Sequence, residues 1–206
     1  MMKKLAVSAA LAALAAAPLS ASANTPISPV GPTVTVLTAT PTLVGAGVGV
    51  SALGTGSLSF DASGNAVGLF PITGGFLDPD LSNAKIEHVG SGLRLSRSGV
   101  DVDLENFLID TTLAQDTIFG QVTVGSTVLN DVPLFTLSGL NLFLSDTAGA
   151  ALNSFLGIPN LAGAQLGFAL TSPVAAVPEP ETYAMMIAGL GAIAVMARRR
   201  QQALKI

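Results

Sequence analysis

His88 is the only histidine of this sequence, which also contains no cysteine. Any mechanism that uses an imidazole as base or ligand must therefore use His88, and thiol chemistry is excluded. Glu87 precedes it in a strand-like segment, where neighbouring side chains point to opposite faces, so the two cannot share a metal ion. No Gly-x-Ser-x-Gly nucleophile elbow is present. We interpret His88 as a strand-end or turn residue before Gly90; the alternatives are haem or metal ligation and hydrolytic catalysis.

Three carboxylates, Asp101, Asp103 and Glu105, recur at every second residue. On a strand this spacing places them on one face, because alternate side chains point the same way and each residue advances the chain by about 3.3 Å. Calcium prefers a loop that adds carbonyl oxygens, and a glycosidase pair needs a cleft. We therefore predict a solvated face, with weak calcium binding as the alternative, and expect no cofactor. The same interpretation applies to Asp78 and Asp80.

The elements that carry these residues show the two-residue alternation of β-strands. Residues 92–109 predict a hairpin with its turn at 97–99, in which apolar side chains point inward and the carboxylates outward. A second hairpin is predicted from 117–124 and 127–129, joined by Gly125 and Ser126.

The remaining pattern completes a mainly β domain. Residues 134–144 predict a strand pair or one bent strand, broken at 138–139, and Leu166, Phe168 and Leu170 a last strand. Between them, Ser145 or Asp146 caps a helix that ends at Gly157. We predict an antiparallel β-sandwich or partial barrel with one short helix covering an end.

The charge of the middle of the chain limits its partners. Residues 24–177 hold three basic residues against eleven acidic ones. Binding to nucleic acid requires Lys and Arg to neutralise phosphates, so this balance argues against a nucleic-acid partner.

The N-terminus has the order of a secretory signal peptide. Lys3 and Lys4 precede an apolar run over 5–19, and Ala21 and Ala23 form the small-residue pattern of a cleavage site. We expect export through the Sec translocon and removal of residues 1–23 by signal peptidase.

The C-terminus has a second composite signal. The segment VPEPETY at 177–183 is followed by an apolar stretch and then by Arg198, Arg199 and Arg200. Pro178 and Pro180 favour an extended, accessible strip. The apolar stretch predicts a transmembrane helix over 182–197, and the basic tail 198–206 places its end in the cytoplasm.

This tail resembles the PEP-CTERM sorting signal of Gram-negative bacteria over about residues 177–201. The resemblance implies an exosortase, a membrane cysteine transpeptidase, that recognises Pro178, Glu179 and Pro180 and cleaves nearby. It also implies a transient inner-membrane anchor, delivery to the cell surface or extracellular matrix, and a producer of exopolysaccharide or biofilm.

The middle domain also resembles HtaA-like domains, a family that includes haem-uptake surface proteins. The segments that carry this similarity are ITGG at 72–75, IEHVGSGL at 86–93, LENFLID at 104–110 and AGAALNSFLG at 148–157. Haem binders of that family use a tyrosine iron ligand supported by histidine. The only tyrosine here is Tyr183, in the tail, so the resemblance implies the scaffold rather than the haem activity.

We therefore predict four segments: the signal peptide, a Thr/Pro/Gly-rich segment 24–56 of flexible or strand-edge character, a β-rich domain 57–174 and the sorting signal 175–206. The predicted function is that of an exported, non-enzymatic surface protein associated with exopolysaccharide or biofilm matrix. Two alternatives stay open: an HtaA-like module for haem or a hydrophobic ligand, and a secreted hydrolase.

Overall fold

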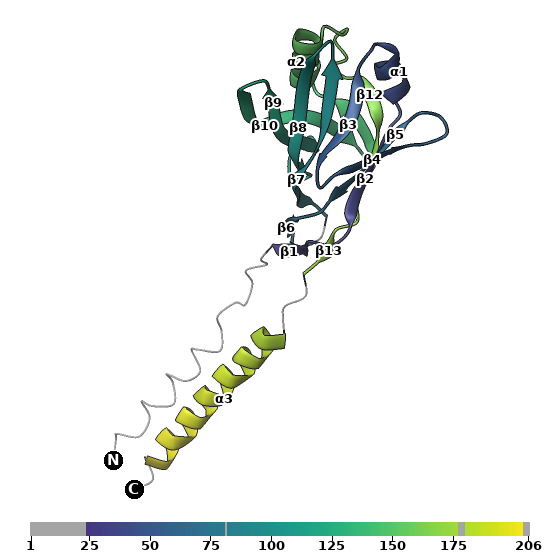
Figure 1. Ribbon diagram of the computed structural model, residues 1–206. Coiled ribbons are helices and arrows are strands. Elements are labelled where there is room, and N and C mark those ends of the chain that lie inside the picture. The colour runs from purple at the N-terminus through teal and green to yellow at the C-terminus, as the bar shows by residue number, and fades with distance from the viewer. Residues whose placement is uncertain (1–23, 81, 177–179, 204–206) are drawn as a thin grey trace.

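The computed structural model describes residues 24–80, 82–176 and 180–203 (Figure 1). The predicted signal peptide, with Ala21 and Ala23, lies outside the described residues, as do Pro178 and Glu179 of the sorting motif.

The described part of the chain forms one continuous antiparallel sheet. Its strand order is β13-β1-β6-β7-β8-β9-β10-β11-β12-β2-β5-β4, and β3 pairs with β7. The strands are β1 (Thr25–Ser28), β2 (Pro32–Leu37), β3 (Gly49–Gly54), β4 (Ser57–Phe60), β5 (Ala66–Pro71), β6 (Gly74–Leu77), β7 (Ala84–Arg97), β8 (Val100–Asp110), β9 (Thr117–Val124), β10 (Thr127–Ser138), β11 (Asn141–Leu144), β12 (Gln165–Leu170) and β13 (Val174–Ala175). The helices are α1 (Thr40–Gly45), α2 (Asp146–Leu156) and α3 (Pro180–Ala203).

The sheet curls into a half-barrel because its long strands are bulged side by side. The register shifts between His88 and Gly92 on β7, and between Leu129 and Val132 on β10. The β8–β9 pairing shifts in the same way, between Glu105 and Leu108. Bulges bend a strand and increase its twist, so adjacent bulges fold the sheet around its apolar face. The predicted mainly antiparallel architecture is confirmed, and it takes the half-barrel form (Figure 1).

The two sides of this half-barrel are bridged by one stretch of chain. β3 pairs with β7 and the following β4 pairs with β5, so residues 49–60 connect strands that are distant in the sheet order. The corner between them needs a glycine. Gly54 has a φ of 58°, and a Cβ there would lie 2.0 Å from the carbonyl oxygen of Gly90.

The predicted hairpins and helix are confirmed. β7 and β8 pair around Ser98 and Gly99, whose positive φ values of 52° and 81° match a type I′ turn. β9 and β10 pair around Gly125, and β10 and β11 around Gly139. At α2, the Ser145 hydroxyl accepts a hydrogen bond from the Ala148 amide, and Gly157 ends the helix in the left-handed conformation. α2 covers one end of the half-barrel (Figure 1).

Residues 24–56 do not form a separate segment, contrary to the predicted boundary at 57. β2 lies in the middle of the strand order, between β12 and β5, and β1 and β3 pair with β6 and β7. α1 was not predicted. Its Pro41 stands at the start of the helix, where a missing amide hydrogen costs nothing.

The C-terminal helix α3 begins at Pro180, so the part of the predicted extended strip that the structure describes is helical. Proline is suited to the first turn of a helix because its fixed φ matches and its absent amide is not needed there. Among the described residues, no helix has the length and apolar character needed to cross a membrane, and the predicted transmembrane helix over 182–197 is therefore not supported.

Candidate functional site

His88 lies inside the half-barrel rather than at a turn, with 1% of its surface exposed. Its Nε2 is 2.7 Å from the Thr33 hydroxyl, and its Nδ1 is 3.2 Å from the carbonyl oxygen of Phe107. A carbonyl oxygen only accepts, so Nδ1 carries the proton and Nε2 accepts from Thr33. Thr33 then has no further hydrogen to give, and the Thr171 hydroxyl, 3.0 Å away, donates to it.

The surroundings of His88 keep it neutral. Burial lowers the pKa of its imidazole, and this effect outweighs the hydrogen bonds with the main chain of Phe107 and Ile86, which raise it. Both ring nitrogens already have protein partners. The imidazole therefore ties β7 to β8 and β2, and neither nitrogen has a lone pair or proton free for a metal, a haem iron or a substrate.

The outward carboxylates of β8 pair with an arginine instead of surrounding a cation. Arg94 lies opposite Asp103 on the neighbouring strand, with Nε 2.6 Å from Oδ1 and Nη2 2.7 Å from Oδ2. Asp101 is 3.7 Å from the same guanidinium, and Asp103 together with Asp101 and Glu105 raises the pKa of Arg94. The charges on this face are thus satisfied across strands.

The other acidic candidates are also explained by local contacts. Asp78 accepts a hydrogen bond from the Asn83 amide at 3.1 Å, and Asp80 accepts from the hydroxyl and amide of Ser82. In the part of the chain that the structure describes, no three side chains of histidine, aspartate or glutamate come together as a metal site. The metal-ligand candidates His88, Asp101, Asp103 and Glu105 therefore do not converge.

An ion pair between a partly exposed lysine and a buried aspartate was not predicted from the sequence. Lys85 Nζ lies 2.9 Å from Asp110 Oδ2, across the β7–β8 pairing, while Asp110 Oδ1 accepts from the amide and hydroxyl of Thr112. Burial of Asp110 favours its neutral form, but these hydrogen bonds and Lys85 together lower its pKa. The pair joins the two longest-paired strands near β6.

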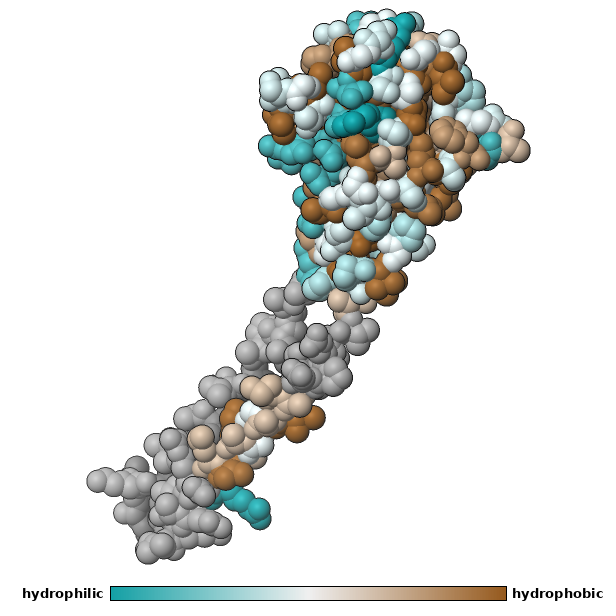
Figure 2. All heavy atoms as spheres, viewed as in Figure 1, coloured by the Kyte–Doolittle hydropathy of each residue, from teal (hydrophilic) through white to brown (hydrophobic). Residues whose placement is uncertain are grey.

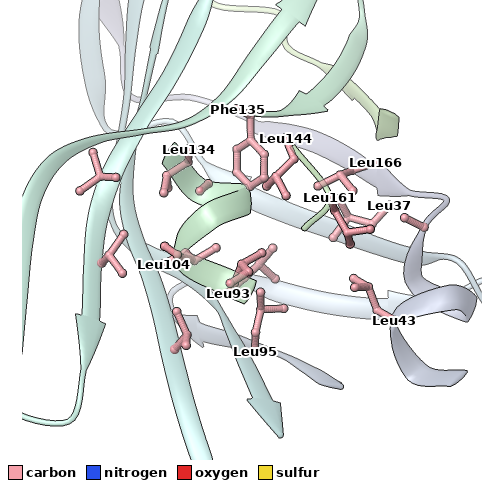
Figure 3. Close-up of a pocket in the computed structure, with 17 residues that line it drawn as sticks. Leu37, Leu43, Leu93, Leu95, Leu104, Leu134, Phe135, Leu144, Leu161 and Leu166 are labelled. Atoms are coloured by element: carbon pink, nitrogen blue, oxygen red, sulfur yellow. The ribbon is translucent and has the colours of Figure 1, made fainter. Parts of the chain in front are cut away.

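The concave side of the sheet encloses an apolar cavity of about 60 Å³ (Figure 3). Leucines from β7, β8, β10 and β12 point into it, together with Leu37 of β2 and Leu43 of α1, and α2 contributes Ala148 and Ala151. A neighbouring cavity of about 30 Å³ contains His88 and Thr33 and shares Leu37, Leu93 and Phe135 with the first. Pockets for drug-sized ligands measure about 300–1,000 Å³, so neither space admits a tetrapyrrole.

The C-terminal helix differs in kind from the rest of the molecule. The described side chains of 184–196 are exposed on every side of α3, and most are apolar; Figure 2 shows tan and brown residues on the face of this helix that is turned to the viewer. Arg198, just beyond them, is exposed as well. The β domain leaves these described side chains of α3 uncovered.

The chain leaves the domain beside the point where the described residues begin. β13 pairs with β1, so that Ala175 lies opposite Ile27 and Val174 opposite Ser28. The Ala176 amide donates to the Pro26 carbonyl oxygen at 2.8 Å. β1, β6 and β13 lie together at the end of the half-barrel that is nearest to α3 (Figure 1).

Comparison with known proteins identifies this tail. The model of the PEP-CTERM protein-sorting motif matches residues 176–200. The match confirms the predicted sorting motif and implies that the chain is exported, sorted to the surface and processed by an exosortase. No curated protein and no solved structure matches the chain, and the predicted resemblance of the middle domain to HtaA-like domains is not supported.

Proposed function

We propose that this chain is a non-enzymatic surface protein whose β domain is the cargo of an exosortase-dependent route and associates with extracellular polysaccharide or biofilm matrix. The observation that carries the proposal is the sorting motif at 176–200, attached directly to the last paired strand of a folded domain. In the proposed route the Sec translocon exports the chain, signal peptidase removes residues 1–23, and α3 is held at the inner membrane until the exosortase acts.

The side chains of the domain support a non-catalytic role. The only imidazole is buried and hydrogen-bonded at both nitrogens. Arg94 and Lys85 are engaged with aspartates of β8. An acidic domain that keeps its charged groups paired or solvated is suited to staying soluble outside the cell.

The processing step is tested by expressing the full chain with and without a partner exosortase and measuring the mass of the mature C-terminus. We expect a product that ends near Pro178–Pro180 only when the exosortase is present. Pro178→Ala together with Pro180→Ala should abolish this product, whereas Ser172→Ala, on the exposed segment before β13, should leave it unchanged. A C-terminus at Ile206 in the exosortase host contradicts the sorting proposal.

The matrix association is tested separately with the processed domain. In co-sedimentation with exopolysaccharide purified from the exosortase host, the domain should be found in the pellet. An unrelated control domain of equal size and charge should stay in the supernatant. Equal recovery of both proteins in the supernatant would remove the matrix partner and leave the sorting route intact.

A second function is favoured by the cavity beneath α2: binding of a small apolar molecule. The cavity is lined by apolar side chains alone, which makes water unfavourable in it. We expect xenon, which is small enough for this cavity, to raise the melting temperature of the domain, since a ligand that binds only the folded state stabilises it. Ala151→Leu, which fills the space, should remove this shift. Haem titration should give no Soret shift, and a shift would revive the haem alternative.

A further inference from the structure

The first residue of the sorting motif directly follows the two-residue strand β13 and is hydrogen-bonded to β1. The match to the sorting motif begins at Ala176, and the Ala176 amide donates to the carbonyl oxygen of Pro26. Val174 and Ala175, directly before it, pair with Ser28 and Ile27. The sorting motif therefore does not start on free chain, because its first main-chain amide is already used by β1.

The two strands of this pairing are anchored very differently. On β1, Ile27 is 5% exposed, and the start of the strand also pairs with β6. On β13, Val174 is 51% exposed and Ala175 is exposed as well, so β13 contributes no buried side chain. Pro26 has no amide hydrogen and cannot return the hydrogen bond from Ala176. Such a strand opens at low free energy while β1 stays in place.

While β13 is paired with β1, only a short stretch of chain is available for an enzyme to bind. Residues 177–179 are all that separate Ala176 from the start of α3 at Pro180, which is about 10 Å of extended chain. Enzymes and receptors that read extended peptides do so through main-chain hydrogen bonds. Release of β13 back to Thr171, which is half-buried against Thr33, lengthens the available chain to about 30 Å.

We propose that the β1–β13 pairing is a latch, and that the exosortase acts on the form of the protein in which residues 174–176 have separated from β1. This inference rests on the proposed sorting function. It assigns control over the rate of tail processing to β1, which lies about 150 residues before the motif in the chain.

A disulfide across the latch tests the proposal. Ser28 and Val174 are opposite each other, and neither belongs to the matched segment. Directly paired residues of antiparallel strands have the Cα spacing of a disulfide, and the natural chain has no cysteine that could interfere. The variant Ser28→Cys with Val174→Cys, co-expressed with the exosortase, should lose processing when oxidised and regain it after reduction.

The matched control places the same cross-link elsewhere in the sheet. Thr123 and Val128 are also opposite each other, on the β9–β10 hairpin, which lies away from β1 and β13 (Figure 1). Thr123→Cys with Val128→Cys should be processed at the rate of the natural chain, oxidised or reduced. Processing of the oxidised latch variant at that same rate overturns the latch. Absence of processing in the natural chain contradicts the sorting function itself.

Opening the latch gives an independent measurement. Val174→Pro removes an amide hydrogen at the position paired with Ser28, outside the matched segment. The variant should be processed at least as fast as the natural chain in a pulse-chase experiment, because its open form is more populated. Slower processing would mean that the paired strand is the form that the enzyme reads, and it would overturn the proposal.

Discussion

His88 shows how the role of a single residue depends on partners that are distant in the sequence. His88 is the only histidine, and its neighbour Glu87 points to the opposite face of the strand. Both facts limit the chemistry that His88 can perform. The two groups that decide its role, the Thr33 hydroxyl and the Phe107 carbonyl oxygen, are brought to it by β2 and β8. The predicted turn position was wrong because β7 continues through His88 to Arg97, and the alternation that buries Ala84 and Ile86 also turns His88 inward.

The burial of His88 predicts a pH dependence of stability. Its folded-state pKa is lowered, so between that value and the unfolded value of about 6.5 the unfolded chain binds more protons. The contribution of neutral His88 to the free energy of unfolding is therefore fully present above about pH 6.5 and is lost as the pH falls through this window. Urea unfolding at about pH 7.5 and pH 5.5 should give a smaller free energy of unfolding at the lower pH.

His88→Gln is the control for this prediction. Glutamine keeps an acceptor for Thr33 but does not titrate. The variant should be less stable at neutral pH and should lose most of the dependence between the two pH values, since the chain has no other histidine. An unchanged dependence would show that His88 is not responsible.

At the scale of elements, some parts of the fold follow from local sequence signals and others from tertiary contacts. The hairpins and α2 carry their own turn and capping residues, which is why the sequence predicts them. The corner between β3 and β4 carries no comparable local signal. Its geometry is imposed by pairing with β7 on one side and β5 on the other, and Gly54 is needed because the backbone of Gly90 approaches it closely.

Two glycines with nearly the same φ test this account of the corner. Gly54 and Gly125 have φ values of 58° and 59°, but nothing lies within 4 Å of a Cβ at Gly125. Gly125→Ala should cost about 1–2 kcal/mol, the price of a left-handed alanine alone. Gly54→Ala should cost more than about 4 kcal/mol or prevent folding, because it adds a backbone collision. Thermal unfolding followed by circular dichroism measures both, and equal losses of stability would contradict the role given to the close approach of Gly90 to Gly54.

At the scale of the whole molecule, the described domain runs from the first paired strand to the last, and β1 and β13 lie side by side at one end. The two ends of the described domain therefore leave the half-barrel from the same place. The sequence boundary at 57 followed a change in composition, whereas the sheet order depends on β2, which is closed in by β5 and β12.

Two fragments distinguish these boundaries. Residues 24–176 should fold with nearly the same melting temperature as the chain that retains α3, because the side chains of 184–196 are exposed and contribute no packing to the sheet. Residues 57–176 lack β1, β2 and β3 and should not fold cooperatively, since β5 and β12 lose their common partner. Circular dichroism and thermal unfolding measure both, and a cooperative transition in the shorter fragment would support the boundary at 57.

The sequence by itself determined the sorting motif, the hairpins with their turns, α2 and the acidic character of the domain, because each depends on residues that are close in the chain. Only the tertiary structure decided that the sheet curls into a half-barrel, that residues 24–56 complete it, that His88 is an internal hydrogen-bonding residue and that the first residue of the sorting motif is hydrogen-bonded to β1. Each of these depends on main-chain or side-chain contacts between segments far apart in the sequence, such as Thr33 with His88 and Pro26 with Ala176. Patterns along the chain describe the faces of strands, but not which strands become neighbours.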